Sequence, residues 1–374
     1  MTGITLLLCI LLVLAGVLLI GAEVKKAPRK PVLSIICFKG YAEPTWVKPF
    51  EKKYNATVKV TYVETADECF TKVKTNPKAY HIVSVNAGRV KIYYDEGLIQ
   101  AIDTEKLENY GNMVWFFRGH SYAEMEWGVK YHVPMTWGTQ TITVNTAKIP
   151  EKQLRKYLSK DKKTISLNVL TAKEFKGKTA LFDETTNVVS IAAIHSGIKT
   201  PFTFEPKDWK KVEAKLLAWK RNARTFTTGL DSEFDVVSAE EALILLGGND
   251  TLLNLKLEEA GIRGNFTQYP MTQGTICLVD GWVITKPTAG KSLNLALKYI
   301  DYIIGDEGQS NMAKLVGFGI VNTAGKEAYD PVALEATWWY GEDPDDVPFP
   351  IYIMVAEEDP GRRLELWNKV KATP

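Results

Sequence analysis

Residues 135–145 read MTWGTQTITVN, and residues 280–284 read DGWVI. Each is a short run of apolar and β-branched residues in which a tryptophan, a glycine and a polar side chain occur together, as is typical of a strand. A chain that leaves one lobe, builds a second and then returns needs two such crossing strands. We therefore predict two lobes with a ligand cleft between them, because clefts between domains commonly hold small molecules.

The predicted domain boundaries follow from these two strands. Lobe 1 comprises residues 32–140 and 282–374, and lobe 2 comprises residues 141–281. The 374 residues of the chain suit two domains better than one. The net charge is only +2, so composition gives no indication of nucleic-acid binding. Aromatic residues make up 11% of the chain, which fits either large cores or the walls of a cleft.

The chain begins with an apolar, uncharged run at residues 4–22, followed by a basic segment as far as residue 31. The run is long enough to span a bilayer, and it also resembles a secretory signal. We expect residues 1–31 to form a signal or an N-terminal membrane anchor plus a linker. The rest is expected to be exported, either periplasmic or anchored facing the extracytoplasmic side. In that compartment Cys37 and Cys69 could form a disulfide, or both could remain buried free thiols, and the sequence is compatible with either state.

Strand and helix patterns alternate along the chain. In lobe 1 the order is strand, helix, strand, helix, strand, which predicts a parallel sheet covered by helices. The segments are residues 32–38, 44–54, 58–63, 66–75 and 80–85. In lobe 2 we expect a strand at residues 179–182 with a helix at residues 188–196, and further short helices at residues 240–246 and 252–260.

Ligands of open α/β sheets bind beyond the carboxyl ends of the strands. Asp280 stands within a mostly apolar run, where a carboxylate either marks a strand end or needs a partner, so a ligand contact is favoured. Asp183 and Glu184 follow the strand at residues 179–182 and precede a helix. An N-cap explains one of them as well as a ligand contact does.

Enzyme chemistry is not indicated. The four histidines are scattered without metal-ligand spacing, and the sequence has no CxxC pair, GxSxG, P-loop or HExxH motif. We expect a binding protein with no catalytic residues, no metal and no cofactor.

Four stretches carry a family resemblance. They are YYDEGLIQAID at residues 93–103, VPMTWGTQTITVN at residues 133–145, LVDGWVI at residues 278–284, and residues 296–304 together with GFGIVN at residues 317–322. In these stretches the chain resembles the periplasmic solute-binding proteins of ABC importers, in particular the spermidine/putrescine-binding branch. The resemblance implies a two-lobed α/β fold of type II with mixed, mostly parallel sheets. Two crossing hinge strands would let the lobes close on a small solute without covalent chemistry.

The resemblance also implies the ligand and its contacts. In that branch, acidic groups hold the ammonium ends of a polyamine and aromatic rings cover its methylene chain. Carried over position by position, the ligand-binding residues are Tyr41, Glu43, Asn86, Glu184, Asn187, Asp280 and Phe318. Asn187 stands where the branch usually has a second acid, and Leu278 stands where it has a tryptophan.

The implied ligand is therefore a small, polar, amine-bearing solute, and the implied partner is the permease of an ABC transporter. A smaller amine, an amino-acid-like compound and iron stay open as other ligands. We expect a monomer that binds no nucleic acid. The alternative function is a membrane-anchored ligand sensor on the same fold.

Overall fold

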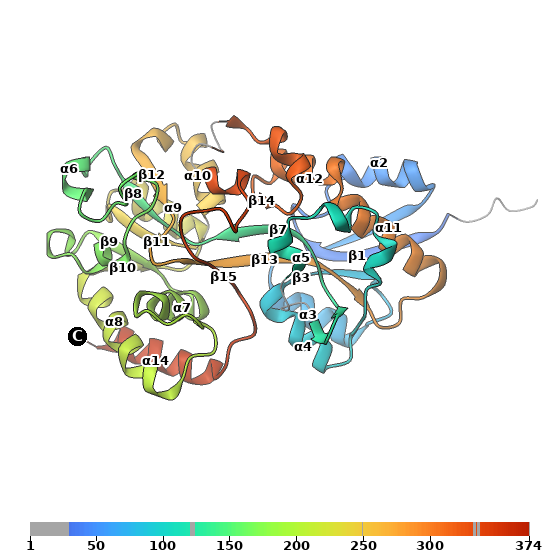
Figure 1. Ribbon diagram of the computed structural model, residues 1–374, viewed down its shortest axis with the longest axis horizontal. Coiled ribbons are helices and arrows are strands. Elements are labelled where there is room, and N and C mark those ends of the chain that lie inside the picture. Colours follow the sequence, from blue (N-terminus) through green and yellow to red (C-terminus); the bar gives the residue numbers. More distant parts are fainter. Residues whose placement is uncertain (1–29, 120–123, 249, 332–333, 335–336, 374) are drawn as a thin grey trace, which may run out of the picture.

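The computed structural model describes residues 30–119, 124–248, 250–331, 334 and 337–373. They form two lobes, each built around its own sheet, and extended segments run between the lobes (Figure 1). The predicted two-lobed α/β fold is confirmed. The apolar run at residues 4–22 lies outside the described residues, and within the described part no helix is long and apolar enough to cross a bilayer.

Lobe 1 contains a mixed sheet with the strand order β14-β7-β13-β3-β1-β2, and β4 and β15 pair with β13 outside that order. The strands are β1 (Val32–Phe38), β2 (Thr57–Val63), β3 (Ile82–Asn86), β4 (Ile99–Gln100), β7 (Val133–Thr139), β13 (Thr275–Thr285), β14 (Gly319–Ile320) and β15 (Ile351–Ile353). A separate hairpin consists of β5 (Glu124–Glu126) and β6 (Val129–Lys130). β1 is parallel to both β2 and β3, as the alternation of strands and helices predicts.

Helices cover both faces of this sheet. They are α2 (Pro44–Tyr54), α3 (Ala66–Thr75), α4 (Val90–Asp95), α5 (Trp115–Gly119), α11 (Gly290–Ile304) and α12 (Asp306–Leu315). Successive side chains of a strand point to opposite faces. Ile35 of β1 accordingly belongs to the core under α2 and α11, whereas Ile36 belongs to the core under α3 and α4. The sheet is thus buried on both sides, which explains the continuous apolar run of β1.

Lobe 2 contains a second sheet with the strand order β10-β9-β11-β8-β12. Its strands are β8 (Thr141–Asn145), β9 (Thr179–Phe182), β10 (Ala223–Thr227), β11 (Ile244–Gly247) and β12 (Phe266–Tyr269). Its helices are α6 (Glu151–Leu154), α7 (Thr185–His195), α8 (Trp209–Asn222), α9 (Leu230–Ser238), α10 (Asp250–Glu259) and α14 (Pro360–Ala372).

The predicted helix at residues 240–246 is wrong. Most of the apolar part of that segment forms β11, which lies between β9 and β8 in the middle of the sheet. Every residue of β11 is buried, so the strand shows no alternation of apolar and polar side chains. A short apolar run of this kind has the same appearance in a buried strand as in a buried helix.

Within the described residues, the chain crosses between the lobes three times, once more than predicted. The first crossing is at Gln140, between β7 and β8. At the second crossing Ile276 belongs to the core of lobe 2 and Cys277 to the core of lobe 1, so the return precedes the predicted boundary at residue 281. The third crossing follows β15, which runs parallel to β13. These three segments are the hinge.

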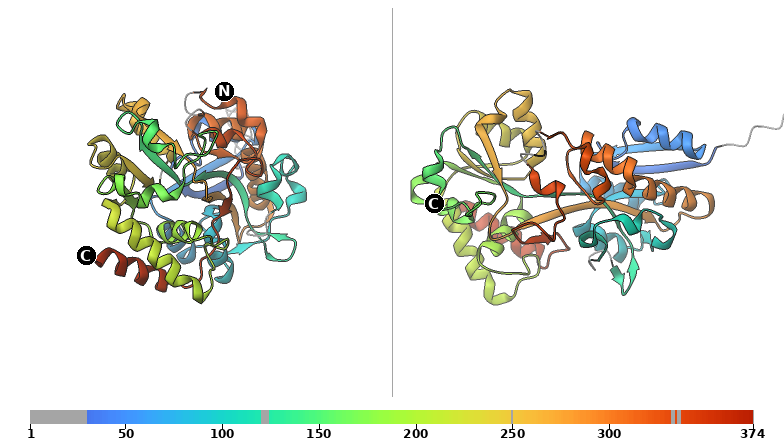
Figure 2. Two further views of the ribbon diagram at one scale, coloured as in Figure 1. Left: turned by 60° about the vertical axis from the view of Figure 1, so that its left-hand side comes forward. Right: turned by 45° about the horizontal axis from the view of Figure 1, so that its top comes forward.

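The C-terminal helix belongs to lobe 2. The prediction placed residues 282–374 entirely in lobe 1, but α14 packs against α7 and α8 (Figure 2). Trp367 of α14 is fully buried, and its indole Nε1 donates to Asp183 at 2.6 Å. Lys371 forms an ion pair with the same carboxylate at 2.9 Å. The third crossing has no clear sequence pattern, because β15 is only 3 residues long.

Candidate ligand-binding site

β13 carries Asp280 into the space beside the hinge. In the sheet Asp280 pairs with Asn86 on β3 and with Thr136 on β7. The register with β7 shifts between Asp280 and Gly281, which indicates a bulge, and bulges are common next to functional sites because they redirect side chains. Residue 281 must be glycine, since a Cβ there would lie 2.2 Å from the carbonyl oxygen of Val133.

Two neutral groups donate hydrogen bonds to the Asp280 carboxylate. The Tyr41 hydroxyl donates to Oδ2 at 2.5 Å, and Asn86 Nδ2 donates to Oδ1 at 3.0 Å. Burial raises the pKa of Asp280 above its usual range, and the two hydrogen bonds oppose that rise. Burial also raises the pKa of Tyr41 well above its usual range, and the nearby carboxylate adds to the effect. Tyr41 therefore remains a neutral phenol that donates to the acid.

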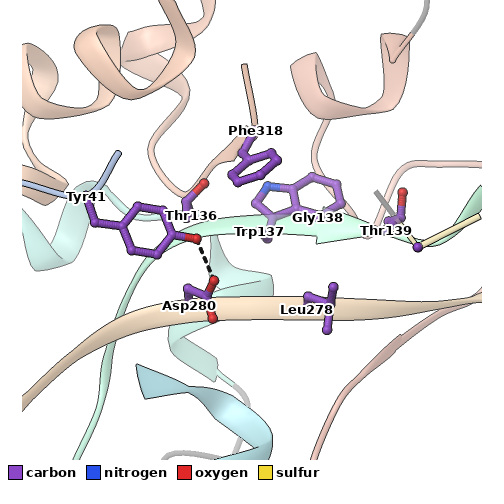
Figure 3. A pocket seen from close by; sticks show the side chains of 9 residues that line it. Tyr41, Thr136, Trp137, Gly138, Thr139, Leu278, Asp280 and Phe318 are labelled. Carbon is purple, nitrogen blue, oxygen red and sulfur yellow. Dashed lines mark hydrogen bonds between the residues drawn. The ribbon is translucent and has the colours of Figure 1, made fainter. Parts of the chain in front are cut away.

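A cavity of about 200 Å³ opens beside this carboxylate. Its lining residues are Tyr41, Thr136, Trp137, Gly138, Thr139, Gly248, Leu278, Asp280 and Phe318. Figure 3 shows Asp280 and Leu278 projecting from β13, with the Tyr41 hydroxyl directed at the carboxylate. Gly248 follows β11 of lobe 2, so both lobes contribute to the cavity.

The aromatic wall of this cavity is fixed in place. The indole Nε1 of Trp137 donates to the carbonyl oxygen of Ile320 at 2.9 Å, and its ring meets Tyr340 edge-on at 4.9 Å between centroids. β14 approaches this indole so closely that a Cβ on Gly319 would lie 2.4 Å from it. Phe318 precedes that glycine and lines the same cavity. Trp137 is thus held by a hydrogen bond and by ring contact within lobe 1.

A second cavity of about 500 Å³ lies beyond Leu278, which lines both cavities. Glu184 and Asn187 line this second cavity. The Glu184 side chain caps α7, because its two oxygens accept hydrogen bonds from the backbone N–H groups of Thr186 at 3.3 Å and Asn187 at 2.8 Å. The N-cap interpretation therefore describes Glu184, whereas Asp183 holds the C-terminal helix.

The second cavity also contains charges that the sequence reasoning missed. Glu357 comes from the third crossing segment, and its Oε2 lies 3.5 Å from Nε of Arg363. Arg363 is 1% exposed and donates to the Ser190 hydroxyl at 3.2 Å. Burial raises the pKa of Glu357, and Arg363 opposes the rise. Arg89 lines the same cavity and pairs with Asp67 at 2.5 Å.

The predicted ligand-binding residues divide among three places. Those on the first cavity are Tyr41, Asp280 and Phe318, and those on the second are Asn86, Glu184 and Asn187. Glu43 lines neither cavity. Its carboxylate accepts a hydrogen bond from the backbone N–H of Gly40 at 2.8 Å, and it supports the turn between β1 and α2.

Several lining residues were not selected from the sequence. Trp137 lies in the quoted stretch at residues 135–145, and its place on a crossing strand was the signal that could have identified it. Gly248 was not selected, because no local pattern distinguishes it. Among the residues that the structure describes, no three His, Cys, Asp or Glu side chains gather into a group that could hold a metal ion.

Known proteins share this architecture. The spermidine/putrescine-binding periplasmic protein of Escherichia coli is 23% identical over 321 residues, which cover 86% of each chain. The putrescine/cadaverine-binding protein of Pseudomonas aeruginosa is 20% identical over 315 residues, which cover 84% of this chain and 85% of that one. The structure of the spermidine/putrescine ABC transporter substrate-binding protein of Streptococcus pneumoniae matches with a TM-score of 0.76 at 19% identity, covering 91% of this chain and 99% of that chain.

The model of one protein family, described as bacterial extracellular solute-binding protein, matches residues 45–338. This match covers most of the chain and agrees with the two lobes, the hinge and the cavity beside it. The protein therefore belongs to the bacterial extracellular solute-binding proteins, and it is a binding protein rather than an enzyme, as predicted.

Proposed function

We propose that this protein captures a small amine-bearing solute between its two lobes, outside the cytoplasmic membrane, and delivers it to the permease of an ABC importer. One observation carries the proposal. Asp280 is the only charged side chain among the residues that line the first cavity, and its two hydrogen-bond donors, Tyr41 and Asn86, are neutral.

A carboxylate that is partly removed from water without a positive partner is unfavourable. The raised pKa of Asp280 expresses this cost, since burial is its largest cause. A cationic solute would offset the cost by supplying the missing charge. The aromatic rings of Trp137 and Phe318 line the same cavity, and a cation is attracted to the face of such rings.

The relatives support the same ligand class, because their names include spermidine, putrescine and cadaverine, all of which are amines. The architecture supports a capture mechanism. In the part of the chain that the structure describes, the two sheets are connected by the three hinge segments, which include β7, β13 and β15, so a rotation about these segments would close the cleft. Release would leave the solute chemically unchanged. We also propose that the protein works as a monomer, which light scattering of the exported chain would test.

The test of the amine assignment compares two solutes of one length that differ in charge, pentan-1-amine and pentan-1-ol. Calorimetry at neutral pH should show the amine binding at least about thirtyfold more tightly, which corresponds to about 2 kcal/mol for a charge-assisted contact. Equal binding of the alcohol would show that the Asp280 charge plays no part. Binding of neither would remove the amine class from the site.

A further inference from the structure

We infer that the solute carries a single positive charge and that the cleft selects against diamines. This inference rests on the proposed function and concerns the far end of the same solute. The Asp280 carboxylate would hold one ammonium group. From there the cavity continues along neutral residues, namely Thr136, Gly138, Thr139, Gly248 and Leu278.

One candidate for a second cation contact is Glu184, whose carboxylate already accepts hydrogen bonds. Both of its oxygens accept hydrogen bonds from the first backbone N–H groups of α7. The N-terminus of a helix carries a positive partial charge equivalent to about half an elementary charge, which reduces the negative potential of a carboxylate that caps it. Glu184 also lines the second cavity and not the first, and Leu278 stands on the wall between the two.

The other acid of the second cavity, Glu357, has a buried cationic partner. Glu357 is the only carboxylate in an ion pair with Arg363 in the described residues, and Arg363 is almost wholly buried. A buried guanidinium that lost this partner would be left uncompensated at a cost of several kcal/mol. Arg89 adds a further positive group to the same lining. Each of the two acids that line the second cavity therefore already has a positive partner, the N-terminus of α7 for Glu184 and Arg363 for Glu357.

Part of the lining of the second cavity is uncharged. Asn187 and Leu278 also line the second cavity, and neither carries a charge. Because Glu184 caps α7 and Glu357 pairs with Arg363, a second ammonium group would lose water there without gaining an unpaired counter-ion. An uncharged alkyl end of the same length has no ammonium hydration to lose there, and it gains contact with Leu278. The preference for one charge follows from this difference.

The deciding experiment compares pentan-1-amine with pentane-1,5-diamine, which have the same five carbons. Calorimetry on the full exported chain at fixed ionic strength should show the monoamine binding at least about tenfold more tightly, which is about 1.4 kcal/mol. Tighter binding of the diamine would overturn the inference and leave the proposed amine function intact. Binding of neither amine would overturn both.

A gain of function provides a second arm. Leu278→Glu places an acid at the junction of the two cavities, and Leu278→Gln is the matched uncharged control. We expect Leu278→Glu to reverse the order in favour of the diamine and Leu278→Gln to keep the order of the natural protein. A folded Leu278→Glu variant that still prefers the monoamine would contradict the inference. If that variant does not fold, the comparison in the natural protein decides alone.

Discussion

Replacing Asp280 with asparagine removes one charge from the cleft and changes almost nothing in shape. Truncating one partner of a hydrogen-bonded charge pair costs about 2–5 kcal/mol of binding free energy. Asp280 is only partly buried, so we expect the lower part of this range, about 2–3 kcal/mol, which is roughly a 30- to 150-fold weaker affinity for a small amine. Calorimetry with pentan-1-amine measures the loss directly. The free energy of unfolding should change little, because the asparagine amide avoids the desolvation cost that raises the pKa of Asp280.

The matched control makes the same substitution at a structural acid. Asp183→Asn breaks the ion pair with Lys371 but keeps an acceptor for the Trp367 indole. We expect it to lower the free energy of unfolding by about 1.5–3 kcal/mol, because hydrogen bonds to charged groups contribute about that much. Its affinity for the amine should stay near that of the natural protein. The reasoning is refuted if Asp280→Asn leaves the affinity unchanged, or if both variants lose affinity equally.

Three further outcomes are expected. As the pH is lowered, the affinity for the amine should decrease, because protonation removes the charge of Asp280, and the decrease should begin above the usual pKa range of aspartate since burial raises this pKa. Tyr41→Phe removes a hydrogen bond that favours the charged form and should move the decrease to higher pH. Calorimetry across the acidic range measures both effects. Gly281→Ala should lower the melting temperature, because its Cβ would lie 2.2 Å from the Val133 carbonyl oxygen and the strain of such overpacking costs about 1–3 kcal/mol. Trp367→Ala should lower the free energy of unfolding by about 3–5 kcal/mol in a denaturant titration, since the indole is fully buried.

The parts of the fold that were predictable share a simple cause. β1 and α3 have the bounds that their sequence patterns predict, because local periodicity and burial agree there. The sequence pattern at residues 135–145 predicts one strand, whereas the structure divides this run into β7 and β8 at Gln140. β11 was not predictable, because its complete burial removes the periodicity that distinguishes a strand from a helix.

The third crossing and the role of α14 depend on long-range packing. Nothing in a stretch of 3 residues such as β15 shows that it will pair with β13, and the burial of Trp367 depends on a helix far away in the sequence. Glu357 was missed for the same reason, since it reaches the cleft only through that crossing.

Among the site residues, Asp280 stood out because an acid in an apolar strand needs an explanation. Glu43 was selected by resemblance, and Glu184 by resemblance and by its place after the strand at residues 179–182. One supports a turn and the other caps a helix, and a sequence shows the presence of a carboxylate without showing which backbone N–H groups it will meet. Trp137 could have been included, because it lies on the first crossing strand.

The central claim is that the two lobes close on a cation held at Asp280, and small-angle X-ray scattering tests it most directly. The radius of gyration should be measured for the natural protein and for Asp280→Asn, each with and without pentan-1-amine at a concentration that saturates the natural protein. We predict that the amine makes the natural protein more compact and leaves the variant unchanged. An unchanged radius in the natural protein at saturation, or equal compaction of the variant, would contradict the account.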